Sequence, residues 1–260
     1  MTEPLRLDRD GAVAVLTLTR PERRNCLSDE TLAALQDALD AIAADEGVRV
    51  LVVAADGPVF SSGHDLRELQ SRRGDADGGS AAWRKTFDAC AAVMRAIVNL
   101  PQPVIAAVEG VATAAGCQLV ASCDLAIAGA GARFATPGVN IGLFCSTPGV
   151  ALARAIAPKH AMEMLLLGEM IDAETALRFG LVNRVTAAGA ALPEARRWAE
   201  QIAGKPRAVI RSGKAVFRRQ APLALADAYA LASGAMTENL GEPAAAEGLG
   251  AFLEKRPPVW

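Results

Sequence analysis

The sequence has only two histidines, His64 and His160, and its five cysteines are irregularly spaced. Two imidazoles cannot build a histidine-rich zinc site, and Cys117 with Cys123 has neither the spacing nor the partners of a zinc knuckle. We therefore expect no bound metal. The number of cysteines is odd and most of them lie in apolar stretches, which is typical of reduced, buried thiols rather than of a disulfide framework.

The chain also lacks an excess of charge of either sign. Its 27 basic and 29 acidic residues give a formal net charge of -2, so no broad positive field exists to attract a phosphate backbone, and we expect no nucleic-acid partner. The first residues, M-T-E-P-L-R-L, contain no basic segment followed by an apolar one. This start predicts neither a secretory nor a transit peptide and favours a cytoplasmic location.

One uncharged run, Phe134 to Ala153, is long enough in principle to cross a bilayer. Pro137 and Pro148, together with several glycines, would break a helix there repeatedly and leave backbone groups without partners in lipid. The composition therefore predicts a buried loop region and no membrane span.

Three well-known catalytic motifs are missing. No G-x-x-x-x-G-K-[ST] occurs, G-A-G-A-R at 129–133 lacks the third glycine of a dinucleotide fingerprint, and Ser146 does not lie in G-x-S-x-G. These absences exclude P-loop nucleotide hydrolysis, NAD chemistry of the Rossmann type and α/β-hydrolase chemistry.

What the chain does contain is an alternation of strand and helix patterns, which predicts an α/β fold. Apolar residues at helical spacing follow Ser28, a candidate N-cap, and Gly47 stands where a C-terminal cap is expected. Short β-branched or apolar runs predict strands at 12–19, 48–54, 104–108, 125–128 and 181–185. Helices are expected around 83–97, 114–122, 172–180, 192–203, 206–220 and 222–240.

Two loops rich in small residues carry the strongest signal for a site. They are V-F-S-S-G-H-D-L at 59–66 and E-G-V-A-T-A-A-G-C-Q-L at 109–119, and each follows a predicted strand and leads toward a helix. Small residues let a ligand approach the main chain, and free N–H groups at a helix N-terminus are preorganised hydrogen-bond donors. The alternative is that the small residues only permit tight packing of helix on sheet.

These loops, together with T-L-T-R-P-E-R-R-N-C-L-S at 17–28, F-A-T-P-G-V-N at 134–140 and A-F-L-E-K-R at 251–256, resemble the crotonase (enoyl-CoA hydratase/isomerase) family. The resemblance covers nearly the whole chain. It implies a crotonase-like spiral of β-β-α units over residues 1–190, which would hold an acyl-CoA site, and a C-terminal helical trimerisation region over residues 191–260. It also implies a homotrimer or a dimer of trimers.

The resemblance assigns a role to several residues. The backbone N–H groups of His64 and Ala115 would form an oxyanion hole for the thioester carbonyl, and the backbone carbonyls of Ser62 and His64 would contact adenine. Coenzyme A would be part of the substrate, and no tightly bound cofactor is expected. Side-chain contacts with coenzyme A are predicted for Arg24, Phe252 and Lys255, the last two from a neighbouring subunit. For Arg24 a solvated surface arginine is the alternative.

The match breaks at the two glutamates that hydratases of this family use as base and acid. Their positions hold Gln118 and Gly138; a carboxamide is too weak a base to deprotonate water, and glycine has no side chain. We therefore expect weak or absent hydration. The candidate substitutes are Cys145 and Ser146, for which buried packing is the alternative, and the imidazole of His64. Asp65 and Asp124 are better explained as acceptors for backbone donors, and Glu109 as a surface residue at a strand end.

Two functions remain open. The first is an enzyme of acyl-CoA metabolism that acts through an enolate, as a weak hydratase, an isomerase, a decarboxylase or a thioesterase. The second is an acyl-CoA-binding or regulatory protein without catalysis, and a structural oligomer is a weaker third reading.

Overall fold

The computed structural model describes residues 3–260. Its strands are β1 (Leu5–Asp10), β2 (Val13–Leu18), β3 (Val50–Ala55), β4 (Val59–Ser61), β5 (Val104–Val108), β6 (Val111–Thr113), β7 (Leu125–Gly129), β8 (Arg133–Ala135), β9 (Ile171–Asp172) and β10 (Arg184–Thr186). Its α-helices are α1 (Asp29–Ala44), α2 (Leu66–Ser71), α3 (Ser80–Asn99), α4 (Ala115–Ser122), α5 (Ser146–Ala155), α6 (Pro158–Leu167), α7 (Ala173–Phe179), α8 (Ala191–Ala203), α9 (Arg207–Gln220), α10 (Leu225–Leu240) and α11 (Pro243–Leu253). Short 3-10 helices cover Pro21–Arg23 (η1), Arg72–Gly74 (η2) and Pro137–Ile141 (η3).

The strands form two sheets, a larger one in the order β1-β2-β3-β5-β7-β10 and a smaller one in the order β4-β6-β8-β9. Pairing is parallel except between β1 and β2 and between β8 and β9. In three successive pairs, β3–β4, β5–β6 and β7–β8, the first strand joins the larger sheet, the second joins the smaller one, and helical chain follows. This is the predicted spiral of β-β-α units.

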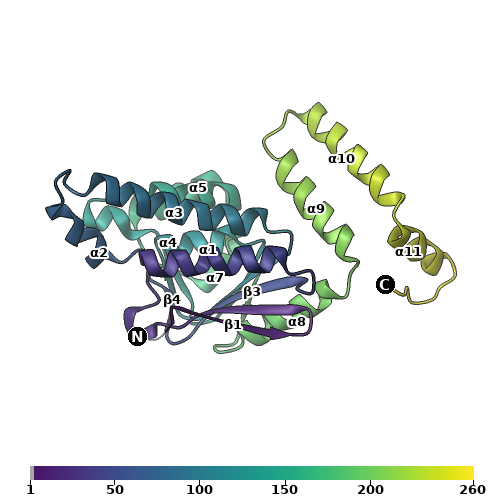
Figure 1. Cartoon of the computed structure of the whole chain (residues 1–260), viewed down its shortest axis with the longest axis horizontal. Coiled ribbons are helices and arrows are strands. Elements are labelled where there is room, and N and C mark those ends of the chain that lie inside the picture. Colours follow the sequence, from purple (N-terminus) through teal and green to yellow (C-terminus); the bar gives the residue numbers. More distant parts are fainter. Residues whose placement is uncertain (1–2) are drawn as a thin grey trace.

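Strand side chains alternate between two cores on opposite faces of the larger sheet. In β3, Leu51 and Val53 contribute to the larger core with the apolar faces of α1, α3 and α4, whereas Val50 and Val52 pack against α8. Figure 1 shows α1 and α3 on one side of the strands and α8 on the other. Because both faces are covered, the strands read in the sequence as nearly continuous apolar runs.

The last three helices leave this layered core. Helices α9 and α10 have no buried residue of their own, and Figure 1 shows α9, α10 and α11 as an arm that projects beyond the rest of the chain. The arm is tied to the core where Lys214 of α9 donates to Asp124 at 2.6 Å and to the carbonyl of Gln102 at 2.9 Å. Helix α8, which begins at Ala191, packs on the larger sheet; an oligomerisation role for residues 191–260 stays a prediction.

Most predicted elements are present, and the Ser28 hydroxyl caps α1 by accepting the N–H of Thr31 at 3.2 Å. The expected cap at Gly47 is wrong, because α1 already ends at Ala44 and its C-cap, Asp45, has an extended backbone that needs no glycine. The last strand lies later than expected, at Arg184–Thr186.

The expectation of a buried loop at 134–153 is also wrong. This segment contains the end of β8, the 3-10 helix η3 and most of α5, and the side chains of Ile141, Leu143, Phe144 and Val150 are exposed. An apolar composition does not by itself show whether side chains face the core or the surface. Within residues 3–260 no helix is long and apolar enough to span a membrane.

Candidate functional site

The smaller sheet brings the predicted site residues to one edge. Its parallel strands β4, β6 and β8 end at Ser61, Thr113 and Ala135, and Thr113 pairs with Ala135 in the ladder. The loops that follow these strands carry residues 62–65, 114 and 136–145. The carboxyl ends of parallel strands are where α/β sheets commonly hold ligands.

At this edge the two predicted loops touch through their main chains. Gly63 has a positive φ of 85°, and a Cβ built on it would lie 3.1 Å from the nitrogen of Ala115 and 2.9 Å from the Cβ of Ala114. A Cβ on Gly116 would lie 2.3 Å from the carbonyl oxygen of Ser61. Neither position has room for a side chain. The glycines therefore allow β4 and the start of α4 to approach as closely as backbones can.

The orientation of the two predicted donors follows from local backbone geometry. Leu27 donates its N–H to the carbonyl of Gly63 at 2.8 Å; because the C=O and N–H of a trans peptide point in opposite directions, the N–H of His64 points away from Leu27. Ala115 is the first residue of α4, where the N–H precedes the intrahelical hydrogen bonds and the helix dipole is positive. Both N–H groups thus belong to the junction at Gly63, and their action on a ligand stays a prediction.

Ala114, which precedes the predicted donor of α4, is strained. Its φ of 50° and ψ of −119° lie outside the regions that residues with a Cβ favour, and such a conformation costs on the order of 1–3 kcal/mol. The Ala114 N–H donates to the carbonyl of Ala135 at 2.9 Å, which fixes the turn. Nothing in the residue type of Ala114 could have revealed this strain.

Two side chains near the junction each carry a buried oxygen atom that has no hydrogen-bond partner within residues 3–260. Gln118, only 4% exposed, lies three residues after Ala115 in α4, and helical side chains lean toward the N-terminus of their helix. Its Oε1 and the hydroxyl of the fully buried Thr136, which follows β8, are both unpaired. A buried polar atom without a hydrogen bond lowers the free energy of unfolding by about 1–3 kcal/mol. Each of these two oxygens is therefore expected to bind a water or a ligand. Thr136 could not be recognised from the sequence, where nothing distinguishes it from other threonines.

Gly138 has no space for a side chain. A Cβ there would lie 2.3 Å from the carbonyl oxygen of Leu143 and 2.7 Å from Sγ of Cys145. Burial raises the pKa of the Cys145 thiol, against a backbone hydrogen bond from Gly138 that lowers it, so the thiol is protonated at neutral pH. Ser146 is exposed, and its hydroxyl turns toward the carbonyl of Phe144 at 3.5 Å. Of the two candidate substitutes, only Cys145 lies against the position that a side chain at Gly138 would occupy.

The imidazole of His64 is held away from water. Its ring meets Phe87 of α3 edge-on, with the ring centroids 5.3 Å apart, and neither ring nitrogen has a hydrogen-bond partner in the described part of the chain. Burial lowers the pKa of this histidine. The imidazole is therefore neutral at physiological pH.

Three carboxylates near the loops are already engaged by backbone donors. Oδ1 of Asp65 accepts two N–H groups at the start of α2, at 2.9 and 3.3 Å. Asp124 accepts the N–H of Val104 at 2.8 Å, and Glu109 accepts the N–H of Ala191 at 2.9 Å. The backbone roles expected for Asp65 and Asp124 are confirmed. The expectation for Glu109 is wrong, because this half-buried side chain caps α8.

The predicted coenzyme A residues fall into two groups. Arg24 is exposed, has a φ of 53°, and accepts the N–H of Ser62 on its carbonyl at 3.0 Å, so these two lie side by side. Phe252 of α11 is 79% exposed, and Lys255 follows that helix. Figure 1 places α11 at the far end of the arm, well away from β4 and α4. Within one subunit the structure does not bring the two groups together.

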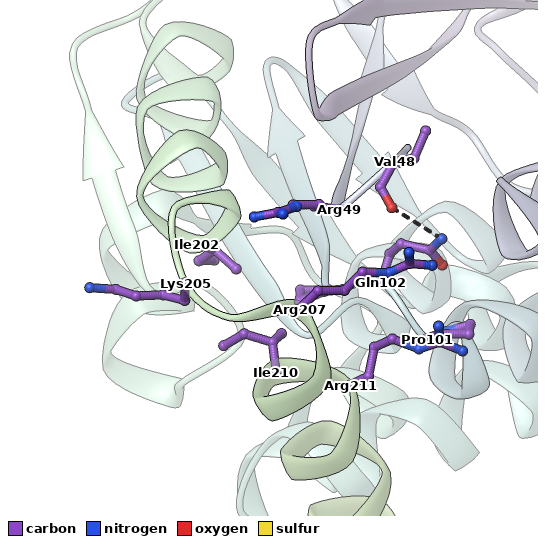
Figure 2. A pocket seen from close by; sticks show the side chains of 10 residues that line it. Val48, Arg49, Pro101, Gln102, Ile202, Lys205, Arg207, Ile210 and Arg211 are labelled. Atoms are coloured by element: carbon purple, nitrogen blue, oxygen red, sulfur yellow. Dashed lines mark hydrogen bonds between the residues drawn. The ribbon is translucent and has the colours of Figure 1, made fainter. Parts of the chain in front are cut away.

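Two small hollows lie elsewhere. Figure 2 shows the first, of about 10 Å³, where α8 leads into α9 beside the amino ends of β3 and β5; it holds about one water. The second, of about 220 Å³, lies between the β1–β2 turn and α8. The first hollow is lined by Val48, Arg49, Pro101, Gln102, Pro103, Ile202, Lys205, Arg207, Ile210 and Arg211.

Within residues 3–260 no group of three or more histidines, cysteines or carboxylates is placed to hold a metal ion.

A spiral of β-β-α units with close backbone contacts at the carboxyl edge of its smaller sheet defines the fold class of this α/β protein. The model of the enoyl-CoA hydratase/isomerase family matches residues 8–260. The chain belongs to this family.

Individual relatives agree with this assignment. The chain is 49% identical to enoyl-CoA hydratase domain-containing protein 3, mitochondrial, of Rattus norvegicus, over 97% of this chain and 82% of the relative. The crystal structure of the human protein of that name superposes with a TM-score of 0.93 at 47% identity, covering 99% and 100% of the two chains. An enoyl-CoA hydratase from Mycobacterium smegmatis superposes with a TM-score of 0.94 at 50% identity, covering 99% and 98%.

One expectation from the sequence is contradicted by these relatives. The rat, mouse, human and Xenopus laevis proteins are all named mitochondrial. The cytoplasmic location expected from the first residues is therefore wrong. That expectation depended on the absence of a leader in the given residues, which says nothing about the compartment in which the folded domain works.

Proposed function

We propose that the chain binds a coenzyme A thioester and polarises its carbonyl group between the backbone N–H groups of His64 and Ala115. The observation that carries this proposal is the main-chain contact at Gly63, which joins the two donor loops at the carboxyl edge of the smaller sheet. Two fixed N–H donors stabilise an oxyanion or enolate because they need no reorganisation as the negative charge develops. Coenzyme A enters as part of the substrate and leaves with the product.

Efficient hydration is not part of the proposed function. A base that activates water and an acid that protonates the α-carbon each contribute about 10²–10⁴-fold to rate. Gln118 is neutral, and the space beside Gly138 is filled by Leu143 and Cys145. The remaining donors contribute on the order of 10²–10³-fold, so the site retains carbonyl polarisation without the usual proton transfers. The function is therefore enolate chemistry on an acyl-CoA that needs no carboxylate base.

We also propose that the arm formed by α9, α10 and α11 is covered by other copies of the chain in a trimer or a dimer of trimers. This is supported by large apolar side chains that the arm leaves exposed in the single chain, because contiguous exposed apolar surface marks interaction sites. Assembly would also bring Phe252 and Lys255 to the coenzyme A of a neighbouring subunit. The exposed apolar residues are Phe217, Leu223, Leu225, Tyr229, Met236, Leu240, Leu249, Phe252 and Leu253.

The proposed function is tested by calorimetry with butyryl-CoA beside a crotonyl-CoA hydration assay. We expect saturable binding of butyryl-CoA by the wild type and hydration no faster than the background reaction. Gln118→Glu is the informative variant, since it restores one carboxylate at a position that already accepts a side chain of the same shape. Absence of butyryl-CoA binding at millimolar concentration would contradict the proposal, and rapid hydration by the wild type would contradict the assigned loss of acid and base.

A further inference from the structure

The first hollow, at the root of the arm, is surrounded by basic side chains from separate segments of the chain. Arg49 directly precedes β3, and Lys205 lies in the connection between α8 and α9. Arg207 and Arg211 belong to the first two turns of α9. Figure 2 shows these four side chains around the hollow. The other lining residues are apolar apart from Gln102, so the lining carries positive charge and no carboxylate.

The basic residues of α9 follow one face of that helix. They are Arg207, Arg211, Lys214 and Arg218, which recur at intervals of four, three and four residues. In the second half of the helix, Lys214 and Arg218 contact the carboxylate of Asp124 at 2.6 and 2.9 Å. This half of the basic face therefore has its counter-ion within the fold.

The half of the face beside the hollow has no comparable counter-ion. Nη2 of Arg207 lies 3.8 Å from Oε1 of Glu46, but the side chain of Glu46 is 85% exposed, so water screens this pair. Neither Lys205 nor Arg211 forms an ion pair in the described part of the chain. The charge at the hollow is therefore left unbalanced, which favours an anion from solution.

The start of α9 adds backbone donors at the same place. This helix of 14 residues has no side-chain cap and no acidic residue in its first turn. Its first intrahelical hydrogen bond runs from the N–H of Ile210 to the carbonyl of Pro206 at 3.2 Å, so the N–H groups of residues 207–209 have no acceptor within the helix. Free N–H groups and the positive end of the helix dipole both favour a phosphate.

Gln102 gives the hollow a buried oxygen without a partner. This residue is 3% exposed, and its Nε2 donates to the carbonyls of Ile42 and Val48 at 2.7 and 3.3 Å; Figure 2 draws the second of these bonds. Because the nitrogen faces these carbonyls, Oε1 is turned away from them, and it accepts no hydrogen bond within residues 3–260. The volume of about 10 Å³ holds one water, which can donate one hydrogen to Oε1 and the other to an anion outside it.

From these contacts we infer that the hollow at the root of the arm binds a phosphate group, as inorganic phosphate or as a phosphate monoester. Lys205, Arg207 and Arg211 donate to its oxygens through charge-assisted hydrogen bonds, together with the free N–H groups of α9. A water on Oε1 of Gln102 lies beneath it. Bound phosphate links the connection after α8 to the first turns of α9 and so steadies the arm where it leaves the core. The hollow lies beside the amino ends of β3 and β5, apart from the proposed thioester site, so this inference does not depend on the proposed function.

The test is equilibrium dialysis of the full chain against ³²P-labelled inorganic phosphate, with sodium chloride keeping the ionic strength constant. We expect saturable binding of one phosphate per chain. Arg207→Gln and Arg211→Gln should each weaken it about tenfold, since each removes a charged hydrogen bond. Arg219→Gln, which removes an exposed charge from the far end of the same helix, should leave the affinity unchanged. Circular dichroism confirms that each variant is folded.

Two competitors separate the possible ligands. Displacement of the label by glycerol 3-phosphate would assign the hollow to phosphate monoesters as well, whereas retention would assign it to the free ion. Saturating butyryl-CoA should displace nothing, and loss of the label would place the ion at the coenzyme A site and overturn the inference. Absence of saturable binding at millimolar phosphate, or equal affinity of wild type and both arginine variants, would overturn it too. Each of these failures leaves the proposed function standing, because butyryl-CoA binding is measured separately.

Discussion

Substitution of Gly116 by alanine tests whether close backbone approach builds the site. The added Cβ would lie 2.3 Å from the carbonyl oxygen of Ser61, where real Cβ atoms essentially never approach within 3.0 Å. The start of α4 must therefore move, because the Cβ would also lie 2.8 Å from Cβ of Ser61 and 2.9 Å from its carbonyl carbon, and none of these three atoms is the far end of a flexible side chain. Overpacking of this kind costs about 1–3 kcal/mol of unfolding free energy. The same shift would move the N–H of Ala115 away from its place in the proposed oxyanion site.

The consequence for binding follows from the loss of one hydrogen bond to the ligand. A net value of about 1 kcal/mol corresponds to roughly fivefold weaker butyryl-CoA binding, and loss of an oxyanion donor corresponds to about 10²–10³-fold in the rate of any enolate reaction. Calorimetry measures the affinity and urea denaturation the stability. Gly131→Ala is the matched control, since a Cβ there meets nothing within 4 Å. Gly116→Ala with unchanged affinity and unchanged stability would refute the reasoning.

Three further changes test the other parts of the site and the arm. Gly138→Ala should lower the unfolding free energy by about 1–3 kcal/mol, measured by urea denaturation, because its Cβ would meet the carbonyl of Leu143 at 2.3 Å. Burial lowers the pKa of His64 in the folded chain below its ordinary value of 6.5. Below pH 6.5 the imidazole therefore binds a proton more readily in the unfolded chain than in the folded one. The unfolding free energy should fall as the pH drops through this range. His64→Gln should reduce this pH dependence while the retained backbone N–H preserves butyryl-CoA binding. Lys214→Met should cost about 2 kcal/mol, measured by thermal unfolding, since it removes a charged hydrogen bond to Asp124, which keeps Arg218 as its second partner.

Each of these expectations has a result that contradicts it. A Gly138→Ala chain as stable as the wild type would show that the loop carrying Cys145 moves aside at little cost. Equal acid sensitivity of wild type and His64→Gln would show that other groups govern the pH response. Arg219 is exposed on the same helix as Lys214, so Arg219→Met serves as the control for the arm, and equal melting temperatures of the two variants would refute the anchoring role.

Much of the fold could be predicted because its elements have strong local signals. The helix from Asp29 to Ala44 has a capping serine and apolar side chains at helical spacing, and α7 lies between Asp172 and Gly180 as expected. Strand β1, by contrast, was missed because its residues are mostly charged and exposed. Its pairing with β2 depends on a neighbouring strand, which no local pattern records.

The candidate site, like the fold, could be predicted from the sequence only in part. The small residues of the two loops could be recognised in the sequence, and in the structure Gly63 and Gly116 permit the tight packing of helix on sheet that was the alternative reading of that pattern. The strain at Ala114 and the filling of the Gly138 position by Cys145 could not be predicted, because both arise from chain segments that meet only after folding. Residue type therefore indicated where the loops lie, the resemblance supplied the two candidate donors, and their contacts depend on how the chain folds.

The most direct test of the account is the infrared absorption of a bound thioester carbonyl. Butyryl-CoA labelled with ¹³C at the thioester carbonyl is measured free and in complex with the protein, and the unlabelled complex is subtracted to isolate that one band. Two N–H donors from His64 and Ala115 would weaken the C=O bond, so we predict a shift to lower frequency on binding and a smaller shift in Gly116→Ala. A bound carbonyl that absorbs at the frequency of the free ligand would contradict the central claim.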